Sequence, residues 1–168
     1  MTNEKVLILT KKQIEQKLNR LAYQVYEDNF EEEEIVVAGI EPNGSVLASR
    51  LVKVLKKISN LTIKEIKISL DKKAPAVGDI ELNINSSELE NKVVILVDDV
   101  LNSGRTLAYA QTALMNVRIK KLRTLVLIDR NHKRFPVATD FSGFSLSTVL
   151  QEHIEVNLDK AEEGVYLS

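Results

Sequence analysis

Residues 93–107, VVILVDDVLNSGRTL, constrain the fold of this chain more than any other segment. The five apolar residues from Val93 to Val97 show no alternation with polar ones, which is typical of a strand buried on both faces of a parallel sheet. Asp98 and Asp99 close this strand, and the polar residues 102–106 then lead into a helical pattern. A loop that enters a helix beyond such a strand presents backbone N–H groups to phosphate. The segment therefore predicts a parallel α/β sheet with a phosphate site beside two carboxylates.

The composition excludes several classes of protein. A length of 168 residues suits one domain with its own core. The absence of cysteine rules out disulfides, thiolate metal sites and cysteine catalysis, and two histidines make a His-rich metal centre improbable. The N-terminus lacks a signal-peptide core and no stretch reaches the length of a membrane span. We therefore expect a cytoplasmic protein without membrane contacts.

Charge is distributed unevenly, although the net charge of −1 offers no general attraction to nucleic acid. Residues 114–148 contain seven lysines and arginines and two aspartates, whereas residues 149–168 contain five acids and one lysine. The four glutamates at residues 31–34 lie between a helical pattern and a strand, so we interpret them as a solvated loop. The basic segment leaves RNA binding open as a function.

Apolar periodicity along the rest of the chain alternates between strands and helices. Residues 11–29 place apolar side chains at helical spacing, and Thr10 can cap that helix. Residues 71–90 are polar and irregular. The alternation predicts one doubly wound α/β domain over residues 1–168. Strands are expected at residues 5–9, 35–40, 61–70, 93–97 and 122–128, with shorter pieces at 80–84 and around Phe135, Ser145, Ile154 and Val165, and further helices after Gly44 and Thr106.

Residues 93–107 resemble the ribose-phosphate loop of the type I phosphoribosyltransferases. The resemblance implies a doubly wound parallel five-stranded sheet with a small hood. It also implies that Asp98 and Asp99 hold the ribose hydroxyls of phosphoribosyl pyrophosphate (PRPP) and stabilise positive charge during catalysis. The residues implied to bind the 5-phosphate are Asn102, Ser103, Gly104, Arg105 and Thr106.

A second segment, IVVAGIEPNG at residues 35–44, is similar to the strand and pyrophosphate loop of the same superfamily. The residues implied to meet pyrophosphate are Glu41, Pro42, Asn43 and Gly44. Read alone, the segment also fits an ordinary strand-to-helix turn. Glu41 puts a negative charge where the family usually has a basic residue, which weakens the expectation of turnover.

A third segment narrows the resemblance. Residues 127–137, LIDRNHKRFPV, continue through Asp140 and Gly143, and they resemble the pyrimidine-operon attenuation regulators, which are also uracil phosphoribosyltransferases. The resemblance implies that Asp129 and Arg130 flank the base and that uracil is the preferred base. It further implies Mg²⁺ bound with PRPP, no metal site made by protein ligands alone, and a homodimer or higher homo-oligomer.

The chain also departs from this family. Its hood segment reads Leu70-Asp71-Lys72-Lys73, without an arginine, although Lys72 or Lys73 could supply a point charge. Asn102 cannot act as a general base, which disfavours hypoxanthine or guanine as the substrate. We expect a structural or surface role for His132, and His153 has no assigned role. Several basic positions that support RNA in the family are lost, and the expected histidine of the first helix is Tyr23.

Because of these departures, two functions other than that of an enzyme remain open. One is a regulator of pyrimidine metabolism that binds a nucleotide or PRPP with little or no turnover. The other is an RNA-binding attenuator.

Overall fold

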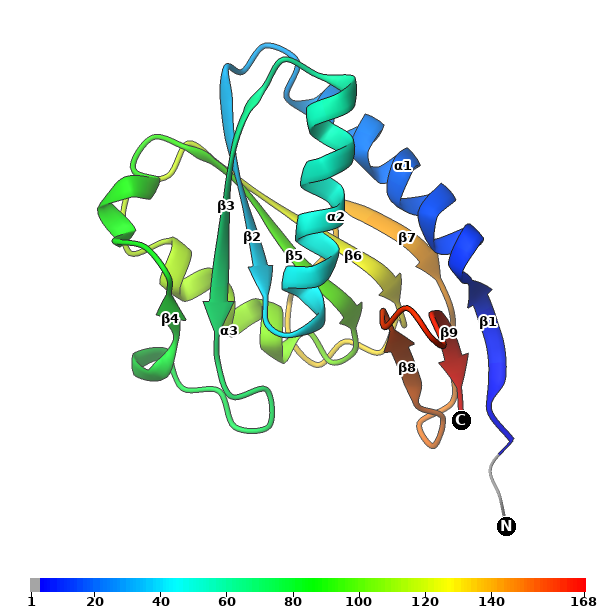
Figure 1. Ribbon diagram of the computed structural model, residues 1–168. Helices are drawn as coiled ribbons and strands as arrows, with labels where there is room; N and C mark the ends of the chain where they lie inside the picture. The colour runs from blue at the N-terminus through cyan, green and yellow to red at the C-terminus, as the bar shows by residue number, and fades with distance from the viewer. Residues whose placement is uncertain (1–3) are drawn as a thin grey trace.

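The computed structural model describes residues 4–168, in which three α-helices lie among nine strands (Figure 1). Two short 3-10 helices, Val77–Asp79 and Ser86–Leu89, flank the shortest strand. The elements run in the order β1 (Val6–Thr10), α1 (Lys11–Asp28), β2 (Glu34–Ile40), α2 (Asn43–Ile58), β3 (Thr62–Ser69), β4 (Glu81–Leu82), β5 (Val93–Leu101), α3 (Arg105–Leu114), β6 (Lys121–Asp129), β7 (Phe141–Ser145), β8 (Ile154–Asn157) and β9 (Gly164–Leu167).

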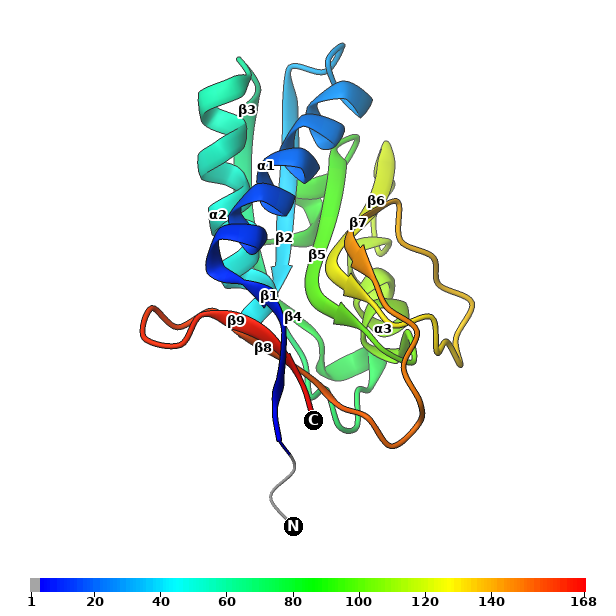
Figure 2. The ribbon, with the colours of Figure 1, turned by 90° about the vertical axis from the view of Figure 1, so that its right-hand side faces the viewer.

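The main sheet confirms the predicted parallel architecture. Its strand order is β4-β3-β2-β5-β6-β7. The five strands from β3 to β7 in this order are parallel, and β4 adds a two-residue antiparallel pairing at the edge. Helices α1 and α2 cover one face and α3 covers the other, as Figure 1 and Figure 2 show. The sheet is therefore doubly wound, with both faces buried.

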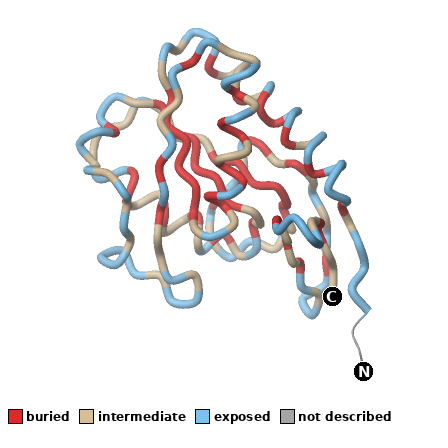
Figure 3. Tube along the Cα trace, viewed as in Figure 1, coloured by how far each residue is buried: buried red, intermediate tan, exposed pale blue. Residues whose placement is uncertain are grey.

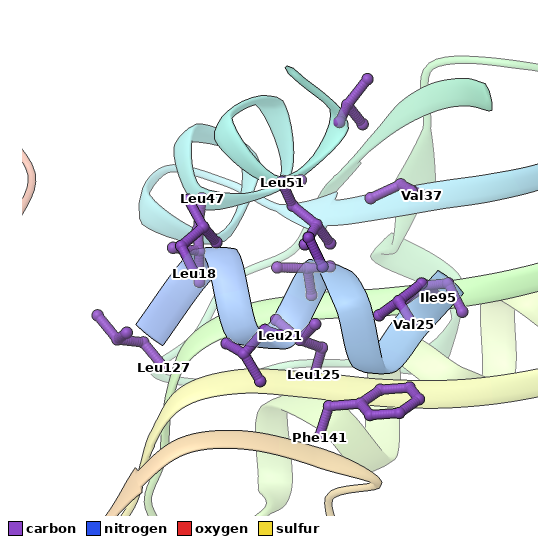
Figure 4. Packing of buried hydrophobic residues seen from close by; sticks show 14 of the residues in the cluster. Leu18, Leu21, Val25, Val37, Leu47, Leu51, Ile95, Leu125, Leu127 and Phe141 are labelled. Carbon is purple, nitrogen blue, oxygen red and sulfur yellow. The ribbon is translucent and has the colours of Figure 1, made fainter. Parts of the chain in front are cut away.

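The apolar run of β5 is buried because its alternate residues enter two different cores. Val93, Ile95 and Val97 pack under α1 and α2, whereas Val94 and Leu96 pack under α3. Figure 4 shows the first core, where side chains of α1 and α2 meet those of the strands. Figure 3 shows that the centre of the main sheet is buried and that the surrounding loops are exposed.

The first helix forms as its sequence predicts. Its apolar face, which includes Ile14, Leu18 and Val25, is buried. The Thr10 hydroxyl accepts the Gln13 N–H, and the Gln13 side chain accepts the Thr10 N–H, so a capping box fixes the start of α1. No helix within residues 4–168 is both long and apolar enough to cross a membrane.

A second, three-stranded antiparallel sheet in the order β1-β9-β8 forms the small hood beside the carboxyl ends of the main strands (Figure 1, Figure 2). The strands expected around Ile154 and Val165 are thus β8 and β9. The strand expected around Phe135 is wrong. The Phe135 N–H instead donates to the Ser103 carbonyl oxygen at 3.0 Å, so this stretch supports the loop after β5 and joins no sheet.

The solvated loop expected at residues 31–34 is only partly correct. Glu31 and Glu33 are exposed, but Glu34 begins β2. Glu32 and Glu34 form ion pairs with Lys120 and Lys92.

Candidate active site

A pocket of about 420 Å³ opens where β5 ends. Its walls are formed by the start of α2, the segment after β3, the end of β5 with the loop that follows it, and β8. Ligands of open α/β sheets bind at this edge because the loops that leave parallel strands diverge there. The lining residues are Asn43, Lys72, Asp98, Asp99, Val100, Asn102, Ser103, Arg105, Thr106, His153, Ile154, Glu155 and Val156.

The two predicted carboxylates lie side by side in this pocket. The sequence predicts that this strand ends at Val97, but β5 runs on to Leu101 through its pairing with β6. Asp98 therefore lies within the strand. Asp98 is 2% exposed, and its Oδ1 accepts the Asp99 N–H at 2.9 Å. The Asn43 amide nitrogen donates to Asp99 Oδ2 at 3.0 Å. The pair is therefore held in place before any ligand enters.

A lysine from the segment after β3 contacts both acids. Lys72 Nζ lies 3.0 Å from Asp98 Oδ1 and 3.8 Å from Asp99 Oδ1. Sequence reasoning gave Lys72 and Lys73 equal standing, whereas in the structure Lys72 alone lines the pocket. The sequence could not distinguish the two lysines, because an irregular turn has no regular alternation of side chains that would show which neighbour faces the pocket.

Burial and charge set the ionisation of this cluster. Burial raises the pKa of the Asp98 carboxyl to about 8, the adjacent Asp99 adds to the rise, and the Lys72 ammonium opposes it. Burial works to lower the pKa of Lys72, but the two carboxylates outweigh it and leave that pKa above its ordinary value. The cluster is thus a partly dry site in which one cation compensates two adjacent acids.

The loop after β5 forms a small cradle at the start of α3. Gly104 caps this helix at φ +86°, a left-handed conformation that costs glycine little. Residues 100–107 enclose a cavity of about 40 Å³. The Ser103 carbonyl oxygen accepts the N–H groups of Arg134 at 2.7 Å and Phe135 at 3.0 Å, which fixes the loop. The first turn of α3 has no acid, and its N–H groups suit a phosphate, although that of Arg105 also donates to the Ser103 hydroxyl at 3.3 Å.

The four residues at 41–44 divide between two places. Asn43 lines the pocket, and Gly44 lies beneath Asp98, where a Cβ atom would come within 2.6 Å of the Val97 carbonyl oxygen. The Glu41 carboxylate instead accepts the Ser69 hydroxyl at 2.7 Å. Glu41 and Pro42 line a separate surface pocket beside Ser69.

Asp129 and Arg130, which are expected to flank the base, lie in different surroundings from each other. Asp129 is 6% exposed, does not line the main pocket, and accepts the Asn131 N–H and the Thr139 hydroxyl. The Arg130 guanidinium donates to Asn102 Oδ1 at 2.9 Å and to the Thr148 hydroxyl and the Glu152 carbonyl oxygen at 2.7 Å each. Arg130 thus ties the loop after β5 to the segment that leads into β8.

Sequence reasoning missed the contribution of β8. His153 and Glu155 line the pocket, although no local pattern around them points to a ligand. Their place depends on the antiparallel pairing of β8 with β9, which brings a distant segment over the end of β5. The His132 ring bonds the Thr148 carbonyl oxygen, in agreement with the structural role expected for it.

Comparison with known proteins is consistent with this geometry. A family model described as the phosphoribosyl transferase domain matches residues 7–161. The chain is 31% identical over 167 residues to the bifunctional protein PyrR of Macrococcus caseolyticus, with 95% of each protein covered. It is 33% identical over 164 residues to the bifunctional protein PyrR of Ligilactobacillus salivarius, covering 89% of this chain and 90% of the relative.

Solved structures resemble the fold as well. The hypoxanthine phosphoribosyltransferase of Trypanosoma cruzi superimposes with a TM-score of 0.78 at 16% identity, covering 96% of this chain and 94% of the other. A hypoxanthine-guanine phosphoribosyltransferase of Bacillus anthracis gives 0.77 at 22% identity, covering 96% and 95%. At these identities the likeness concerns the fold alone.

Proposed function

The chain belongs to the phosphoribosyltransferase family, and on that premise we propose that it transfers the ribose 5-phosphate of PRPP to a nucleobase, preferentially uracil, with release of pyrophosphate. One observation carries the proposal. Asp98 and Asp99 line the same pocket as Asn102, Ser103, Arg105 and Thr106 of the loop that enters α3. A phosphorylated sugar needs both features next to each other.

The chemistry asks for positioning and charge stabilisation. The bond from ribose C1 to the diphosphate oxygen breaks, a bond from C1 to a nitrogen of the base forms, and the base nitrogen loses its proton. The sugar becomes positively charged as the diphosphate leaves, and preorganised anions stabilise such a charge. Asp99, together with Asp98 in its ionised form, supplies this negative charge, and both side chains accept the ribose hydroxyls. Ser103, Gly104 and Thr106 hold the 5-phosphate, which fixes C1 relative to the base.

The pyrophosphate side involves the start of α2. Asn43 reaches the pocket, and Gly44 allows the backbone to approach Asp98 closely. Because the Glu41 carboxylate is directed to Ser69 and lies 3.9 Å from Lys67 Nζ, its repulsion of a diphosphate is weaker than the sequence alone indicates.

Magnesium fits this site as a partner of the substrate. No group of three or more His, Cys, Asp or Glu side chains within residues 4–168 is arranged to hold a metal. Mg²⁺ commonly binds one or two carboxylates and completes its coordination with substrate phosphates and water. Asp98 and Asp99 offer such a pair, and the Lys72 ammonium beside them shows that the pair accepts a cation. When bound, the metal neutralises charge on the departing diphosphate.

The preference for uracil rests on relatives and on one side chain. The relatives named PyrR match most of the chain, and the subfamily that it resembles uses uracil. The pocket carries Asn102 where purine-specific members place an aspartate. We also expect a homodimer, which sedimentation velocity can test.

A regulator without turnover is the second candidate. The segment after β3 offers Lys72 but no arginine, and lysine cannot form a bidentate contact with a diphosphate. RNA binding receives less support, because part of the basic charge is already paired. Lys92 and Lys120 pair with Glu34 and Glu32, and Lys121 and Arg123 pair with Asp28.

Pyrophosphate release in the presence of Mg²⁺, PRPP and each common nucleobase tests the proposal. Release with uracil supports it in full, and release with another base corrects the substrate. If folded protein binds PRPP but releases no pyrophosphate with any base, the regulator is favoured. Binding to a structured leader RNA that weakens steeply with salt would support the attenuator.

A further inference from the structure

The segment that follows β3 contributes one cation to the acidic pair. Lys72 contacts Asp98 and Asp99 from a turn in which Asp71 Oδ1 accepts the N–H groups of Lys73 at 2.9 Å and Ala74 at 3.4 Å. This turn follows β3 and directs Lys72, not Lys73, to the pocket. The Lys72 side chain is 35% exposed, whereas that of Asp98 is 2% exposed. The ammonium therefore covers the buried acid from the solvent side and can move away without disturbing the core.

Any other cation that uses these oxygens must compete with Lys72. Among the residues that the structure describes, no other ammonium or guanidinium forms an ion pair with Asp98 or Asp99. Asp98 Oδ1 already accepts the Asp99 N–H as well as Lys72. A divalent ion placed on the pair would lie close to the ammonium, and like charges in a partly dry site repel strongly.

We propose that Lys72 is a displaceable internal cation that keeps divalent metal off Asp98 and Asp99 until a phosphorylated sugar arrives. The identity of the sugar rests on the proposed function, whereas the competition itself rests on the geometry of the three side chains. The phosphates of the sugar attract the ammonium and supply the oxygens that complete the coordination of a metal. Metal entry is thereby coupled to substrate entry, and the free protein binds metal weakly.

Titration of the full chain with Mn²⁺, followed by the electron paramagnetic resonance of the unbound ion, tests this competition without any turnover. Lys72→Met removes the ammonium while keeping most of the side chain, and we expect Mn²⁺ to bind roughly tenfold or more tightly than to the wild type. Lys72→Arg keeps a cation and should stay near the wild type. Lys73→Met is the matched control, because the Lys73 side chain is exposed and does not line the pocket.

Unchanged Mn²⁺ affinity in folded Lys72→Met would overturn the proposal, as would equal tightening in Lys73→Met. Adding Asp99→Asn to Lys72→Met should remove the gain, and a gain that survives this change would place the metal elsewhere and overturn it too. The result is separable from the proposed function. If the wild type releases pyrophosphate but Lys72→Met does not bind Mn²⁺ more tightly, the proposed enzyme stands and the competition by Lys72 is excluded. If Lys72→Met binds Mn²⁺ more tightly but the wild type releases no pyrophosphate, the competition stands and the proposed enzyme is excluded.

Discussion

The Arg130 guanidinium donates to Asn102 Oδ1 at 2.9 Å and so joins the end of β6 to the loop that follows β5. The same guanidinium holds the Thr148 hydroxyl and the Glu152 carbonyl oxygen, just before β8. Two walls of the pocket therefore meet at one planar group. Arginine has donors only, so the oxygen of the Asn102 amide must face it and the amide NH₂ must point away.

Replacing Arg130 by lysine keeps the charge but removes the planar fork that joins Asn102 to Thr148 and Glu152. We expect kcat/KM for pyrophosphate release to fall roughly tenfold to a hundredfold, because misplaced walls lose the reacting geometry. Arg134→Lys is the control, since Arg134 is exposed and its side chain has no hydrogen bond in the described structure. Equal kcat/KM in Arg130→Lys and the wild type would show that Arg130 does not position the site.

Gly44→Ala should disturb Asp98 directly. The new Cβ atom would lie 2.6 Å from the Val97 carbonyl oxygen and 3.1 Å from Asp98 Oδ1, and both belong to the central strand β5. Overpacking of this kind costs about 1–3 kcal/mol of unfolding free energy, and we expect activity to fall along with it. Urea denaturation and pyrophosphate release measure the two effects. Gly78→Ala is the control, because nothing lies within 4 Å of its Cβ position; equal losses in both variants would contradict the argument.

Local sequence patterns were sufficient to predict most of the fold and the contiguous half of the site. The uninterrupted apolar run at residues 93–97 requires cover on both faces, and β5 has it. The Thr10 cap and the apolar face of α1 act within one helix. The acids and the cradle of residues 102–106 follow one another along the chain, so their common location follows from a strand, a turn and a helix.

The other half of the site depends on contacts between distant segments. Arg130 finds its partners 18 to 28 residues away, and His153 reaches the pocket through the pairing of β8 with β9. The choice of Lys72 over Lys73 is made by a turn around Asp71. Glu41 points to Ser69 because β3 lies beside β2. None of these relationships leaves a periodic or compositional signal in the sequence.

Asp99→Asn should lower turnover at least roughly tenfold while leaving the fold intact. The amide keeps the size of the side chain and can still accept from Asn43, but it carries no charge to stabilise the developing cation. Single-turnover pyrophosphate release measures the chemical step, and thermal melting checks the fold. Asp79→Asn, at an exposed position outside the pocket, provides the control. Unchanged turnover in Asp99→Asn would remove Asp99 from the mechanism.

The buried carboxyl of Asp98 should make stability depend on pH in the direction opposite to that of most acids. Its pKa is about 8 in the folded protein, against about 3.9 for an unfolded chain. Between these values the folded state binds more protons than the unfolded state, so stability is highest at low pH and is lost as the pH rises through the window. Above the folded pKa the loss is complete and the dependence levels off.

Asp98→Asn removes this titration while keeping the shape of the side chain. In metal-free urea denaturation, we expect the variant to gain on the wild type by up to about 1.4 kcal/mol per pH unit between about pH 5 and pH 7. Asp28→Asn is the control, because a hydrogen bond from Arg123 lowers the pKa of Asp28 and its contribution changes only at more acidic pH. A difference between Asp98→Asn and the wild type that stays constant from about pH 5 to pH 7 would mean that Asp98 is already ionised throughout, and that Lys72 compensates its charge more fully than burial opposes it.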